Sequence, residues 1–235
     1  MPIRRIKPIT NTDNLRPVHK PNMIKKAALS TQYTVSSADN TSSHNKKKVN
    51  VMVLGLGCGW KTKITTLPEL SEKLTKESGV KTYVMCNTST ASIAKDIVKV
   101  SCGIRPSRTT PFVLSVPHNV EQLVNSGKHV QLIGHSFGGS VVSRVAENLF
   151  SKPNYLRNIS FYTIGSIYTT GLKYVKHILH VKDVALKCSG LVPGDKKIGD
   201  ASIRWIGKTN NNIKSTEAHK LYTYHPTILA LLRKK

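Results

Sequence analysis

A serine flanked by glycines is the residue with the clearest chemical potential in this chain of 235 residues. The segment Gly134–Gly138 has the sequence Gly-His-Ser-Phe-Gly, which places Ser136 two positions from a glycine on each side. A serine hydroxyl is a weak nucleophile until a histidine accepts its proton and a carboxylate orients that histidine. Nucleophilic chemistry at Ser136 would therefore require a histidine and an acid from elsewhere in the chain.

The sequence around Ser136 predicts how it would be presented. Val130–Ile133 is a short apolar run typical of a buried strand, and Ser140–Phe150 has apolar residues at helical spacing. A serine on a sharp strand-to-helix turn needs neighbours without Cβ atoms, and Gly134 and Gly138 meet that need. The bare glycine-serine-glycine pattern arises often by chance, so its weight comes from the strand and helix on either side.

Strand and helix patterns alternate along most of the chain. Such alternation predicts an α/β fold, a three-layer sandwich whose central sheet is mostly parallel. The expected strands are Val49–Leu54, Val80–Met85, Phe112–Val116, Val130–Ile133, Ile159–Ile164, Lys176–Val181 and Ile203–Ile206. The expected helices are Leu67–Ser78, Ala91–Val100, Val120–Asn125, Ser140–Phe150 and part of His219–Leu232, the last interrupted near Pro226.

The chain divides into a tail and one domain. Residues 1–48 are basic and polar, and they end in three consecutive lysines. Such a segment cannot bury enough apolar surface to offset the entropy of ordering it, so we expect a disordered tail. Residues 49–235 are long enough to form one domain with its own core.

The segment Val130–Arg144 resembles the nucleophile elbow of the α/β-hydrolases, in the Gly-His-Ser-x-Gly-Gly form common among lipases and esterases. The resemblance implies a small α/β-hydrolase fold and hydrolysis of carboxylic esters through an acyl-enzyme on Ser136, with no cofactor and no metal. The stretch from Ser166 to Val175, where many members insert a cap, is short. We therefore expect no large cap domain and an open site suited to ester or lipid substrates.

The resemblance also implies that the acid and the histidine follow the serine in that order. Asp183 is the expected acid because it follows a predicted strand, and Asp195 and Asp200, which flank turn-forming glycines, are the alternatives. His219 is the expected base because it comes after the last strand, where the final helix begins. His225, just before a proline, is the alternative base.

The oxyanion hole of such a site needs two backbone N–H donors. The resemblance implies that Phe137 provides one of them, because it follows the nucleophile. The second is expected from the glycine-rich loop after the first strand, where Leu56, Gly57 and Cys58 are the candidates. This loop lacks the histidine that commonly precedes the glycines in related enzymes.

Charge and cysteines suggest partners and compartment. Lys and Arg number 36 against 12 Asp and Glu, a net charge of +24 that favours polyanions such as an anionic membrane surface or nucleic acid. An idle hydrolase-fold protein that binds polyanions is thus the alternative function.

The four cysteines form no CxxC pair, which disfavours zinc. No signal peptide or transmembrane run is evident, so we expect an intracellular, cytoplasmic protein. The sequence does not indicate an oligomeric state.

Overall fold

The computed structural model describes residues 47–55, 67–86, 94–95, 98–99, 111–186, 191–207 and 213–233. Nearly all of the predicted tail and most of the helix expected at Ala91–Val100 lie outside these residues. The division into a tail and a domain therefore remains a prediction.

Strands and helices alternate through the described part of the chain. The strands are β1 Lys48–Leu54, β2 Thr82–Cys86, β3 His129–His135, β4 Ile159–Ile164, β5 Val175–His180, β6 Lys197–Ile198 and β7 Ala201–Ile206. The helices are α1 Leu67–Ser78, α3 Pro111–Asn125, α4 Phe137–Leu149, α5 Pro153–Leu156, α7 Ser215–Ala218 and α8 Leu221–Arg233.

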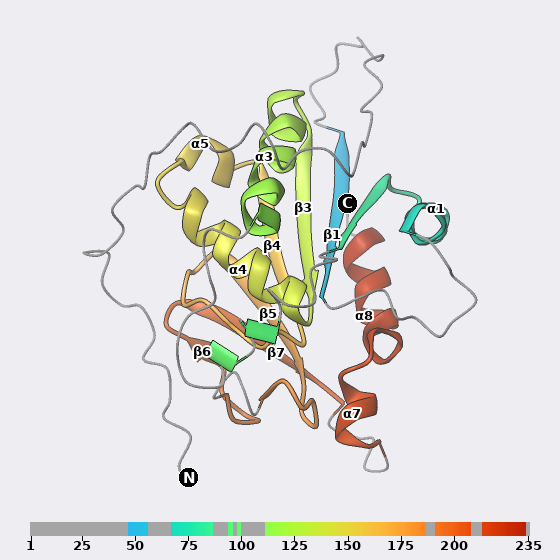
Figure 1. Cartoon of the computed structure of the whole chain (residues 1–235), viewed down its shortest axis with the longest axis vertical. Coiled ribbons are helices and arrows are strands. Elements are labelled where there is room, and N and C mark those ends of the chain that lie inside the picture. Colours follow the sequence, from blue (N-terminus) through green and yellow to red (C-terminus); the bar gives the residue numbers. More distant parts are fainter. Residues whose placement is uncertain are drawn as a thin grey trace.

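The strands form one sheet in the order β2-β1-β3-β4-β5-β7-β6, and all pairs are parallel except β6 with β7. Helices cover both faces, with α3 and α4 on one side and α1 and α8 on the other (Figure 1). Because successive residues of a strand point to opposite faces, the sheet divides the interior into two cores. One contains Val51 and Leu132, and the other contains Met52 and Ile133. The predicted three-layer architecture with a mostly parallel sheet is confirmed.

The strand expected at Phe112–Val116 is wrong, because these residues form the start of α3. A short apolar run is compatible with either structure. A longer stretch of sequence distinguishes the two structures. Four buried residues follow one another at helical spacing, three or four positions apart, in the core beside α4: Val113, Val116, Val120 and Leu123. The helix also begins at Pro111, a position that tolerates proline because the first N–H of a helix has no acceptor within it.

The interruption expected near Pro226 is also wrong, because α8 continues through this residue. Proline inside a helix costs about 3 kcal/mol. The helix buries Tyr224, Ile228 and Leu232 against the sheet. Each such side chain contributes about 1.5–3 kcal/mol, so the burial exceeds the cost of the proline.

The order of the strands determines where a ligand could bind. The chain moves outward from β1 to β2 and then returns to place β3 on the other side of β1. At such a reversal the connections leave the two central strands in opposite directions, and a crevice opens at their carboxyl ends. The connection from Ile164 to Val175 contains no helix, so it adds no cap above this edge. None of the helices in the described residues is both long and apolar enough to cross a bilayer.

Candidate active site

Ser136 lies on the turn between β3 and α4, at the carboxyl ends of β1 and β3. Its backbone has φ 56° and ψ −127°, and it is the one non-glycine residue with positive φ in the described residues. The two flanking glycines are required by their surroundings. A Cβ atom on Gly134 would lie 2.3 Å from the carbonyl oxygen of Gly138, and one on Gly138 would lie 2.1 Å from that of Val53. The turn therefore holds a strained serine between backbone segments that leave no room for side chains.

Three residues far apart in the sequence meet at this turn. The Oγ atom of Ser136 lies 2.8 Å from Nε2 of His219, and Nδ1 of His219 lies 2.7 Å from Oδ1 of Asp183. His219 belongs to the turn between α7 and α8, and Asp183 follows β5. Because a carboxylate only accepts, Nδ1 bears the hydrogen and Nε2 is left to accept from the serine. The three residues chosen from the sequence are thus adjacent, in the geometry that proton transfer from serine to histidine requires.

The carboxylate of Asp183 is buried and accepts hydrogen bonds from two further groups. Its Oδ1 accepts the backbone N–H of Ala185 at 2.7 Å, and its Oδ2 accepts the hydroxyl of Tyr224. The Tyr224 oxygen in turn accepts the backbone N–H of His180 at 2.9 Å. Burial and the charge of Asp183 raise the pKa of Tyr224 far above its ordinary value, so the phenol stays a donor. The carboxylate is therefore fixed by donors on both oxygens.

A glycine makes room for this arrangement. Gly165, which follows β4, has φ 53°, and a Cβ atom there would lie 2.7 Å from Oδ2 of Asp183 and 3.2 Å from the hydroxyl of Tyr224. A side chain at this position would push the acid and the phenol apart.

His135, the residue before the serine, holds the main chain of His219. Burial, with a smaller contribution from the proximity of His219, lowers the pKa of His135 to about 4, so its ring is neutral near pH 7. Its Nε2 lies 3.0 Å from the carbonyl oxygen of His219, and only a protonated Nε2 can donate to that oxygen. The turn that presents the serine thus also positions the segment that presents the histidine.

The alternative acids and base lie elsewhere. His225 is paired with Glu77 of α1, with 3.2 Å between Nε2 and Oε2. Asp195 forms a turn, in which its Oδ2 accepts the N–H of Val192 at 3.0 Å, and Asp200 is exposed beside β7. The described residues contain no group of three His, Cys, Asp or Glu side chains that could hold a metal ion.

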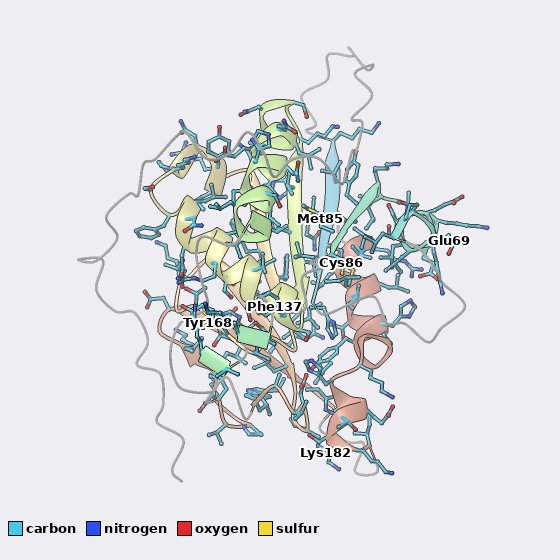
Figure 2. The ribbon with its side chains drawn as sticks, viewed as in Figure 1. Glu69, Met85, Cys86, Phe137, Tyr168 and Lys182 are labelled. Atoms are coloured by element: carbon cyan, nitrogen blue, oxygen red, sulfur yellow. The ribbon has the colours of Figure 1, made fainter. Side chains whose placement is uncertain are left out.

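Only part of the predicted oxyanion hole can be placed. Phe137, labelled in Figure 2, is the first residue of α4, so its N–H has no acceptor within the helix. Gly55 follows β1 and approaches it closely, since a Cβ atom on this glycine would lie 2.9 Å from the nitrogen of Phe137. Leu56, Gly57 and Cys58, the candidates for the second donor, lie outside the described residues.

No family model and no curated protein matches this sequence. Similar solved structures include a cutinase-like protein from Cryptococcus sp., at 10% identity and a TM-score of 0.42, covering 79% of this chain and 92% of that chain. Trichoderma reesei cutinase in complex with a phosphonate inhibitor is similar at 15% identity and a TM-score of 0.43, covering 81% of this chain and 80% of that chain. The RedJ thioesterase of the prodiginine pathway in Streptomyces coelicolor is similar at 12% identity and a TM-score of 0.40, covering 94% of this chain and 99% of that chain.

The fold is defined by this chain's own features. A mostly parallel sheet has the order β2-β1-β3-β4-β5-β7, helices cover both faces, and the serine lies on the tight turn after the central strand β3. The chain therefore has the α/β-hydrolase fold, in a small form without a cap between β4 and β5.

Proposed function

We propose that this protein is a serine hydrolase of carboxylic esters, of the esterase or lipase type. The observation that supports the proposal is the continuous hydrogen-bonded chain from Ser136 through His219 to Asp183, built on a strained turn at the carboxyl edge of the sheet. A strained backbone conformation persists only where the surrounding structure enforces it, and it is concentrated at functional sites.

The reaction proceeds in two halves. The Nε2 atom of His219 accepts the proton of Ser136 while Oγ attacks the ester carbonyl carbon, and a tetrahedral oxyanion forms. The protonated histidine then gives this proton to the leaving alkoxide, which departs as an alcohol and leaves an acyl-enzyme. In the second half a water molecule loses its proton to His219 and attacks the acyl carbon. The histidine returns the proton to Oγ, and the carboxylic acid is released.

Two further groups serve these steps in the proposal. The negative charge of Asp183 stabilises the imidazolium form of His219 in both halves. The N–H of Phe137, at the positive end of the α4 dipole, stabilises the oxyanion together with a second donor from Leu56–Cys58.

The short β4–β5 connection favours a substrate with its own bulk. An enclosed site removes water from a small substrate by closing over it. Here the connection from Ile164 to Val175 has no helix to close, and the His219 side chain keeps 24% of its surface exposed. Lipid esters and other esters presented at an interface are the substrate class that such a site suits.

A fluorophosphonate probe tests the nucleophile directly. We expect it to phosphonylate the protein at neutral pH, and peptide mapping to find the label on Ser136, because only a serine activated by a base attacks phosphorus readily. The S136A variant should not be labelled, whereas S202A, which removes an exposed hydroxyl on β7, should be labelled at the parent rate. A folded parent protein that is not labelled would identify the chain as an idle member of the fold.

Tyr224→Phe is expected to lower kcat by about tenfold, the effect of about 1.4 kcal/mol, which lies in the range for a hydrogen bond to a charged group. The variant removes the donor to Oδ2 of Asp183 and leaves the ring in place. Without this donor the carboxylate is held less firmly against Nδ1 of His219, so the loss should appear in kcat. A purely structural role would lower the melting temperature and leave kcat at the parent value.

A further inference from the structure

A basic residue lies one or two positions before the first residue of each of five parallel strands. We define the basic row as Lys81, Lys47, Lys128, Arg157 and Lys173, in the order of β2, β1, β3, β4 and β5 across the sheet. Each row member lies two residues before a residue that packs in or against the core beside α3 and α4, namely Tyr83, Val49, Val130, Ile159 and Val175.

Backbone hydrogen bonds place the row at one edge. The carbonyl of Lys81 accepts the N–H of Asn50 at 2.9 Å, and that of Lys47 accepts the N–H of His129 at 3.3 Å. Because neighbouring strands are about 4.8 Å apart, the row extends over about 19 Å across the sheet. The register places Lys81 and Lys173, at its two ends, two residues further along their strands than the other three members. This edge is the upper end of the sheet in Figure 1, opposite the end that bears Ser136.

Three members of the basic row are not neutralised by the fold. Lys128, Arg157 and Lys173 have no carboxylate partner among the described residues. Two acids on the adjoining helices have other partners: Glu121 pairs with Lys152 at 2.6 Å, and Glu77 with His225. The carbonyls at the end of α8 are bonded by another cation, since Nζ of Lys48 lies 3.3 Å from the oxygen of Leu232.

We propose that the basic row binds the phosphate backbone of a nucleic-acid strand. One strand of a nucleic acid presents a charge about every 3.4 Å along its axis, so about six phosphates fall within the roughly 19 Å of this narrow band of five cations. A membrane presents a plane of charge and would need a two-dimensional field of cations. Binding by this edge also leaves the carboxyl edge free, so the surface is independent of the proposed esterase.

Fluorescence anisotropy with a labelled oligothymidine at several KCl concentrations tests the proposal on the full chain. In the K128Q/R157Q/K173Q variant we expect affinity at low salt to fall at least about tenfold. The slope of log affinity against log salt should become shallower by about 2, because each lost phosphate contact changes it by about 0.7. The matched control K214Q/K220Q/R204Q removes the same residue types from exposed positions outside the row and should keep the parent slope.

Three outcomes would overturn the proposal: an equal loss in both triple variants, no loss in the row variant, or row-dependent binding to phosphatidylserine vesicles in place of the oligonucleotide. Equal losses would show that only net charge matters, and vesicle binding would make the row a membrane contact. The single variants K128Q and K173Q, each expected to change the slope by about 0.7, decide the matter if the triple variant does not fold.

Discussion

Ser136→Ala is expected to lower kcat for ester hydrolysis by about a million-fold, to the level supported by substrate binding and the oxyanion hole alone. The variant removes the nucleophile whose proton His219 accepts, since Nε2 lies 2.8 Å from Oγ and Nδ1 is bonded to Asp183. Alanine also lacks any group able to form the acyl-enzyme. Stopped assays with a p-nitrophenyl ester over long incubation would measure the residual rate.

His219→Ala should lower kcat by about the same factor as Ser136→Ala, and the double variant S136A/H219A should be no slower than either single variant. Groups that act as one unit are strongly non-additive, because removing one makes the others useless. S202A, with its serine exposed on β7, is the control and should retain the parent rate. Additive losses, or a rate for S136A within about a hundredfold of the parent, would contradict the shared mechanism.

The elbow could be predicted from sequence because its determinants are local. The strand, the glycines and the helix around Ser136 occupy consecutive residues, and the close contacts at Gly134 and Gly138 explain why no other residue type fits there. Asp183 and His219 needed a further constraint, the order of acid and base in a known family. The structure brings both to Ser136, and their catalytic roles remain proposals.

The supporting residues could not be predicted, because their partners are set by packing between distant elements. Tyr224 is 41 residues from Asp183, and its sequence context is that of an ordinary helix residue on the apolar face. His135 is part of the Gly-His-Ser-x-Gly-Gly form, but this form does not reveal its bond to the carbonyl of His219, 84 residues away. Buried polar residues near a predicted nucleophile are the one signal that could have pointed to them.

The errors in secondary structure have a related cause. The run at Phe112–Val116 is apolar in a way that suits a strand as well as a helix, and only burial of Val120 and Leu123 on the same face distinguishes the two. The rule that proline interrupts a helix failed at Pro226 because the packing of α8 against the sheet outweighs a local preference.

Asp183→Asn is expected to lower kcat by about 10⁴-fold. Three groups donate to this carboxylate: Nδ1–H of His219, the N–H of Ala185 and the hydroxyl of Tyr224. Asparagine has one acceptor oxygen and a donating amide, and it has no charge to stabilise the imidazolium. If the amide faces His219, the ring is held in the tautomer whose Nε2 cannot accept from the serine.

The position of the amide can be tested. When the amide faces Tyr224, the histidine keeps its tautomer and only the charge is lost, and Tyr224 must rotate its hydroxyl away. In the Y224F background no hydroxyl opposes either orientation of the asparagine amide. D183N should therefore lower kcat by a different factor in that background than in the parent chain. Steady-state kcat, with rates of fluorophosphonate labelling and melting temperatures, would measure both. Asp195→Asn, the same substitution in a turn outside the site, is the control. A kcat for D183N within about tenfold of the parent would remove Asp183 from the proposed mechanism while leaving Ser136 and His219 in it.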